Sequence, residues 1–158
     1  MKRIFVAIFL FPLVAHSAQS PSSHESCLQT LAAQPKQAHK IAACIEAAAA
    51  GYPDVLYAVG MAYGYSGAAS EEMRYYQASA NKGFPPAFLA MGHVMRSAPY
   101  NNSAEAIKWY ERYVQSRYEG WGYAAALISQ LHQEQGTSQK ATEWAAVCKQ
   151  SSYEGCPK

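Results

Sequence analysis

Apolar and small residues recur every three or four positions along most of the chain, as they do on one face of an α-helix. No segment shows the sustained alternation of apolar and polar residues that marks a half-buried strand. The helical segments come in pairs, which short polar or glycine-containing stretches separate. The first helices of the pairs are expected over 53–65, 86–97 and 121–135, and the second helices over 69–82, 103–118 and 138–150.

The paired segments repeat with a period of about 35 residues, which is typical of helical repeat proteins. The stretch from Trp109 reads WYERYVQSRYEG, and the stretch from Trp144, 35 residues further on, reads WAAVCKQSSYEG. A glycine follows each second helix, at Gly51, Gly83, Gly120 and Gly155. Because such units bury their apolar faces against their neighbours, the period predicts an all-α fold, a right-handed α/α solenoid of about three helix-hairpin repeats.

The start of each second helix carries a serine, at Ser70, Ser103 and Ser138. A serine hydroxyl can accept the hydrogen bond of a free backbone N–H in the first turn, so we expect these residues to be the N-caps.

Residues 25–50 are expected to form a degenerate hairpin ahead of the three repeats, with helices over 25–34 and 37–50. The polar residues 19–24 form a lead-in to it, and the repeat solenoid as a whole is expected to span 25–158.

The first 18 residues have the pattern of a secretory signal peptide. Lys2 and Arg3 precede an apolar run over 4–14, and the small residues Ala15 and Ser17 fit the positions before a cleavage site after Ser17 or Ala18. The apolar run is shorter than the roughly 20 residues that a membrane-spanning helix needs. The alternative is an uncleaved, buried helix. We expect residues 1–18 to be removed and the mature protein to be periplasmic or secreted.

Removal of the signal peptide would leave a chain without net charge. The full sequence has 13 Lys and Arg against 11 Asp and Glu, and two of the basic residues lie in the signal peptide, so that 13 − 2 = 11 of each sign remain. A nucleic-acid partner is therefore not expected, because binding to phosphates requires a surplus of basic side chains. No segment after residue 18 is apolar enough to predict a membrane span.

The four cysteines are Cys27, Cys44, Cys148 and Cys156, and an even number behind a signal peptide predicts two disulfides in any of three pairings. Neither CxxC nor a zinc-type spacing of Cys and His is present, so we expect no metal. The motifs HExxH and GxSxG and a glycine-rich phosphate loop are also missing. The sequence therefore predicts neither catalytic residues nor a cofactor, and favours a protein that is not an enzyme.

The repeat resembles the Sel1-like repeat, a relative of the tetratricopeptide repeat. The residues that carry the resemblance are Val59, Gly60, Tyr63, Tyr75, Tyr76, Ala80 and Gly83 in the first unit, Ala87, Gly92, Ala106, Trp109, Tyr110 and Gly120 in the second, and Ala124, Ala141, Trp144 and Gly155 in the third. The third unit departs from the pattern with Ser129 and His132 at the usual glycine and tyrosine. His132 is accordingly expected in the core.

The spacing of Cys148 and Cys156, with Gly155 directly before the second cysteine, resembles the cysteine-rich Sel1-like proteins of Helicobacter type. This resemblance implies a Cys148–Cys156 disulfide and, with it, a Cys27–Cys44 disulfide.

Relatives of this class imply a protein-binding role in which the first helix of each unit lines a concave surface. The stripe opposite the core positions of these helices contains Tyr57, Met61, Leu89, His93, Arg96, Gln130 and Gln133. The composition is that of an interface, and another protein is the expected partner. The alternative is that Tyr57, Met61 and Leu89 pack between repeats.

The resemblance also suggests two narrower functions. One is an immunity protein that neutralises a periplasmic toxin, such as a secreted phospholipase effector. The other is a penicillin-binding or weakly β-lactam-hydrolysing enzyme, for which the sequence has no SxxK motif.

The signal-peptide prediction can be tested by expressing the full chain in a Gram-negative host and determining the N-terminus of the accumulated protein. The mature chain should begin at Ala18 or Gln19, because small residues precede both cleavage sites. A chain that keeps Met1 in a spheroplast fraction would contradict the prediction.

Overall fold

The computed structural model of the protein describes residues 22–158, and within these residues it contains helices and no strand. The predicted signal peptide and the first residues of the lead-in lie outside the described residues. The regular part consists of six helices, which are α3 (Pro53–Tyr65), α4 (Ala69–Asn81), α5 (Pro85–Arg96), α6 (Ser103–Ser116), α7 (Trp121–Glu134) and α8 (Ser138–Cys148).

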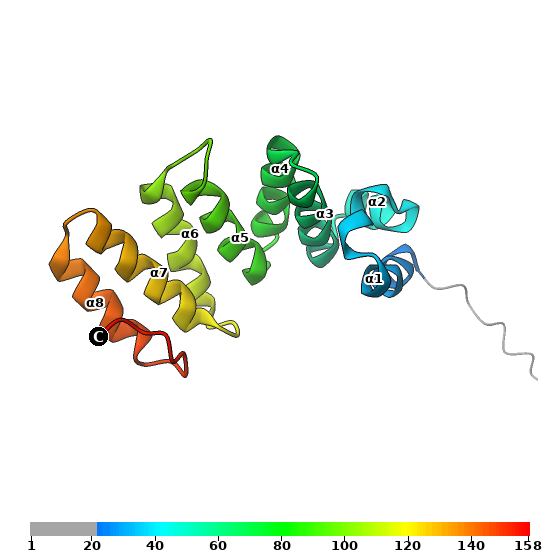
Figure 1. Cartoon of the computed structure of the whole chain (residues 1–158). Helices are drawn as coiled ribbons and strands as arrows, with labels where there is room; N and C mark the ends of the chain where they lie inside the picture. Colours follow the sequence, from blue (N-terminus) through cyan, green and yellow to red (C-terminus); the bar gives the residue numbers. More distant parts are fainter. Residues whose placement is uncertain (1–21) are drawn as a thin grey trace, which may run out of the picture.

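The six helices form three consecutive hairpins, each packed against the next. Helices α3 and α4, α5 and α6, and α7 and α8 pack as pairs, while α4 contacts α5 and α6 contacts α7 across the hairpin boundaries. Figure 1 shows the hairpins following one another from α1 and α2 at one end to α8 at the other. The predicted α/α solenoid of three hairpins with an additional N-terminal unit is confirmed.

The N-terminal unit differs from its prediction. Helix α1 (Ser23–Ala33) begins two residues before the expected start, because Ser22 and Glu25 form a reciprocal capping box. The predicted helix over 37–50 is wrong. A 3₁₀ helix, η1 (Pro35–Lys40), is followed by an extended residue, Ile41, and then by α2 (Ala42–Ala49).

The break at Ile41 allows two faces of this segment to be buried at once. Ala38 and Cys44 are both fully buried, although residues six positions apart on a continuous α-helix would point about 120° apart. The 3₁₀ helix packs against α3, where the His39 ring lies 4.8 Å from the ring of Tyr63, whereas Cys44 is bonded to Cys27 of α1.

The predicted N-caps are also wrong by one or two positions. The caps of α4, α6 and α8 are Ala68, Asn102 and Thr137, so that Ser70, Ser103 and Ser138 lie inside the helices. Asn102 accepts the N–H of Glu105 and is therefore a better cap than Ser103 would be. The Thr137 hydroxyl instead bonds with His132, which ties the end of α7 to the start of α8.

Small residues on the first helices allow large rings on the second helices to approach the backbone. A Cβ atom built on Gly60 would overlap the ring of Tyr76, and one built on Gly92 would overlap the ring of Tyr110. Tyr110 is fully buried. Tyr76 and Tyr110 therefore occupy most of the space between the two helices of their hairpins, because the facing helices have small side chains there.

The buried residues form two separate clusters. One joins the N-terminal unit to α3 and includes Cys27, Cys44 and Val55. The other runs from Tyr76 of α4 to Cys148 of α8. The boundary between the two clusters passes through the first hairpin, between α3 and α4.

Disulfides lie at both ends of the array. Cys27 is bonded to Cys44, which joins α1 to α2, and Cys148 at the end of α8 is bonded to Cys156 in the C-terminal segment. Both pairings are those that the resemblance implied. A disulfide contributes about 2–4 kcal/mol to stability, mainly by restricting the unfolded chain.

None of the helices formed by residues 22–158 has the length and apolar character required to cross a bilayer.

The role of the glycine–tyrosine contact can be tested with Gly92→Ala. The added methyl group would collide with the buried Tyr110 ring, so we expect the free energy of unfolding to fall by about 1–3 kcal/mol. Gly64→Ala is the matched control, because it meets only the mobile end of Glu72 and should gain up to about 1 kcal/mol from helix propensity. Urea denaturation followed by circular dichroism gives both values, and equal losses would contradict the interpretation.

Candidate functional site

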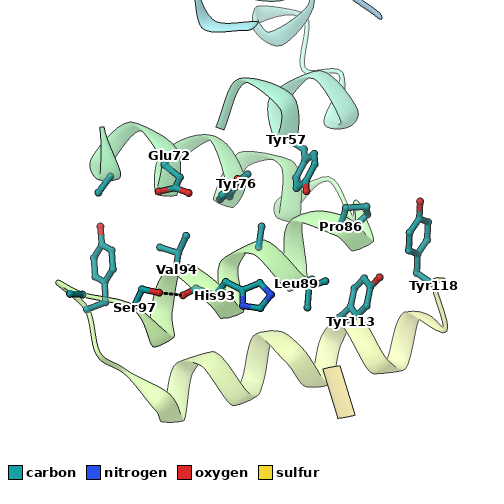
Figure 2. A pocket seen from close by; sticks show the side chains of 14 residues that line it. Tyr57, Glu72, Tyr76, Pro86, Leu89, His93, Val94, Ser97, Tyr113 and Tyr118 are labelled. Atoms are coloured by element: carbon teal, nitrogen blue, oxygen red, sulfur yellow. Dashed lines mark hydrogen bonds between the residues drawn. The ribbon is translucent and has the colours of Figure 1, made fainter. Parts of the chain in front are cut away.

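A cavity of about 510 Å³ lies where the α3–α4 hairpin meets the α5–α6 hairpin. Figure 2 shows side chains from α3, α4, α5 and α6 directed toward this space. The lining residues are Tyr57, Ala69, Glu72, Tyr76, Pro86, Leu89, Ala90, His93, Val94, Ser97, Ala98, Tyr100, Tyr113 and Tyr118.

Helix α4 provides the acidic side of the cavity. The Glu72 carboxylate lies against Gly64 of α3, where an added Cβ atom would displace it. Burial raises the pKa of Glu72 above the usual glutamate value. Among residues 22–158 its carboxylate has no hydrogen bond or ion pair, whereas the neighbouring Glu71 pairs with Arg74 at 2.6 Å on the surface.

Helix α5 forms the opposite side with Leu89, Val94 and His93 (Figure 2). The Nδ1 atom of His93 forms a 3.1 Å hydrogen bond with the Tyr110 hydroxyl. Burial lowers the pKa of His93, and the positive charge of Arg96 lowers it further. Burial also raises the pKa of Tyr110 to about 12. The histidine therefore favours the neutral form, although its ring still reaches the surface.

Tyrosines form the end of the cavity near the start of α5. The Tyr57 ring packs 5.4 Å from Tyr76 and 5.7 Å from Phe84. The Tyr113 hydroxyl donates a hydrogen bond to the carbonyl of Glu119, and its ring lies 6.1 Å from Tyr118. Burial raises the pKa of Tyr57 and of Tyr113. Tyr118 is 44% exposed and stands at the mouth.

This arrangement offers aromatic faces, phenol hydroxyls and one carboxylate. Neither lysine nor arginine is among the lining residues, and neither is a cysteine. No group of three or more His, Cys, Asp and Glu side chains within residues 22–158 is placed to hold a metal ion. The lining can therefore contact a ligand through ring faces, hydroxyl groups and the Glu72 carboxylate.

The predicted partner-binding stripe is divided into separate parts. Tyr57, Leu89 and His93 meet in the cavity. Met61 is half-buried against the larger core cluster, which supports the packing alternative for that residue. Tyr57 and Leu89 combine the two roles, because both pack on the core and line the cavity.

The remaining predicted residues lie outside the cavity. Arg96 of α5 pairs with Glu134 of α7 at 3.1 Å, and Gln130 donates to the same carboxylate at 2.8 Å. Gln133 lines a smaller depression of about 130 Å³ beside α8. The prediction for His132 is confirmed, because it is 8% exposed and bonds to Thr137.

Four further residues line the cavity and were not predicted, namely Glu72, Tyr76 and Tyr113 of the second helices and Tyr118 in the following loop. The repeat register assigns the second helices to the other face, so it does not point to these residues. The small residue at Gly64, one turn after Gly60, was the available signal that a side chain from α4 reaches this point.

The protonation of His93 can be followed by NMR titration of its ring protons. The pKa should lie below the ordinary value of about 6.5, because burial and Arg96 both disfavour the charged ring. The free energy of unfolding should then fall as the pH decreases from about 6.5 toward the folded-state pKa, since the unfolded chain binds the proton more readily. Arg96→Gln should raise the pKa, and an unchanged value in that variant would contradict the assignment.

Comparisons with known proteins support the fold. No family model and no curated protein matches the chain. Among solved structures the chain is similar to MamA, with a TM-score of 0.55 and 16% sequence identity over 80% of this chain and 84% of that chain. A likeness at this identity concerns the fold alone. The chain therefore has a tetratricopeptide-like helical repeat fold.

Proposed function

We propose that this chain is an exported, non-catalytic protein-interaction module whose partner docks over the cavity between the α3–α4 and α5–α6 hairpins. The observation that carries the proposal is the composition of this cavity, which is rich in tyrosine and opens between two repeats of a solenoid. Tyrosine is enriched at protein interfaces because it provides a large rigid contact area together with a hydroxyl group.

Membership in the Sel1-like class is part of the proposal. It is supported by the pairs Gly60–Tyr76 and Gly92–Tyr110, which occupy the positions that the repeat pattern assigns to a small and a large residue. The third unit has Ser129 at the glycine position, and its hydroxyl donates to the Ala141 carbonyl of the facing helix at 2.7 Å.

Export to the periplasm or the extracellular space is supported by the two disulfides, which are compatible with an oxidising compartment. The basic and apolar pattern of residues 1–18 points in the same direction.

Within this class we propose an immunity role, in which the chain neutralises a secreted toxin such as a phospholipase effector. The proposal rests on the resemblance to exported Sel1-like proteins. It fits a short array with disulfides at both ends. No observation at the cavity favours penicillin binding or β-lactam hydrolysis.

The proposal can be tested by placing a photo-crosslinking amino acid at Leu89 in the exported protein, with Lys108 on the exposed side of α6 as the control position. The Leu89 probe should capture one protein, and the immunity role requires it to be a secreted enzyme that the purified chain inhibits. Leu89→Ala and His93→Ala should then weaken binding by roughly thirtyfold, the loss typical of central interface residues.

Arg96→Ala should have a smaller effect on this binding, because Arg96 lies outside the cavity and pairs with Glu134. Unchanged melting temperatures would separate lost contacts from lost folding. Equal crosslinking from Leu89 and Lys108, or full binding by the Leu89 and His93 variants, would rule out this surface.

A further inference from the structure

The cavity carries a negative charge that nothing in residues 22–158 neutralises. Glu72 is its one lining residue with a formal charge at neutral pH, and its carboxylate has no partner in the described part of the chain. Partial burial disfavours the charged carboxylate and thereby raises the pKa of Glu72. A cation placed in the cavity would recover the interaction energy that the carboxylate loses on leaving water.

The arginine whose charge acts on His93 in the cavity is already engaged elsewhere. Arg96 acts electrostatically on His93 but forms its ion pair with Glu134 of α7 at 3.1 Å. At the tyrosine end of the cavity, burial raises the pKa of Tyr113, and the charges of Tyr118 and Glu119 raise it further.

Elsewhere on this chain, arginine side chains cover aromatic rings. The guanidinium of Arg112 lies 4.3 Å from the ring centre of Phe88, and that of Arg117 lies 4.1 Å from the ring of Trp121. In contrast, no arginine or lysine of residues 22–158 lies over any of the five tyrosines that line the cavity. Tyr76 and Tyr113 are buried, so the rings available to a cation from outside the chain are those of Tyr57, Tyr100 and Tyr118.

We propose that the cavity receives an arginine side chain of the partner protein, with its guanidinium on the Glu72 carboxylate and its planar face against the tyrosine rings. Arginine fits this combination better than lysine, because its flat, delocalised cation both stacks on rings and binds a carboxylate through two N–H groups. The volume of about 510 Å³ leaves room for the side chain and the adjoining backbone of a partner loop. The inference rests on the proposed function and specifies the partner chemistry at the same site.

The test uses two small probes on the ¹⁵N-labelled mature chain with both disulfides intact. N-acetyl-arginine-N-methylamide carries the guanidinium, and N-acetyl-citrulline-N-methylamide is its neutral isostere. We expect saturable shifts of the Glu72 and His93 amide signals with the arginine probe, and an affinity at least roughly tenfold above that of the citrulline probe.

The matched variants are Glu72→Gln and Glu71→Gln. Glu72→Gln should remove the preference for arginine over citrulline, whereas Glu71→Gln should keep it, because Glu71 pairs with Arg74 outside the cavity.

The inference is overturned if citrulline binds as tightly as arginine, if Glu72→Gln keeps the preference, or if the shifts map away from α4 and α5. Its failure can be told apart from failure of the proposed function. If a protein is captured through Leu89 but the chain shows no preference for the arginine probe, only this inference is ruled out. Arginine binding at Glu72 without any captured protein would remove the proposed interaction and leave the cation preference.

Discussion

In each of the first two regular hairpins, a tyrosine ring of the second helix lies against the backbone of the first helix at a glycine. A side chain at Gly60 or Gly92 would occupy the space of the Tyr76 or Tyr110 ring, so these contacts set how closely the paired helices approach. The third hairpin keeps the close approach by another means, because the small Ser129 side chain bonds directly to the backbone of α8. The spacing of the paired helices throughout the array depends on these three contacts.

The cavity follows from the same contact. Gly64 lies one helical turn beyond Gly60, and Glu72 lies one turn before Tyr76 on the facing helix. The contacts Gly60–Tyr76 and Gly64–Glu72 are therefore neighbours in one helix–helix interface. At Gly64 the facing side chain is the carboxylate of Glu72, whereas at Gly60 it is the ring of Tyr76. Glu72 is consequently partly withdrawn from water by close packing, yet it faces a space that the α5–α6 hairpin leaves open.

The elements that follow directly from local pattern were predictable from the sequence. The period of glycines, alanines and aromatic residues is sufficient to predict six paired helices and their order. The residues alone left three disulfide pairings open, and only the family resemblance implied the two that form. Helix starts were less predictable, because the choice between Asn102 and Ser103 as a cap depends on loop geometry. The cavity was predictable only in part, since it joins Tyr57, Leu89 and His93 from first helices to Glu72 and Tyr113 from second helices.

The covalent links at the two ends have a consequence for how the array opens. A linear chain of repeats is a one-dimensional system, in which thermal fluctuations ordinarily begin at the terminal units because these have a single neighbour. Here Cys27–Cys44 and Cys148–Cys156 restrain both boundaries. The boundary most open to fluctuation then lies in the interior, between α4 and α5, which pack against each other less extensively than α6 and α7 do. Breathing of the solenoid is thereby concentrated beside the cavity, at the place where a partner's loop would have to enter.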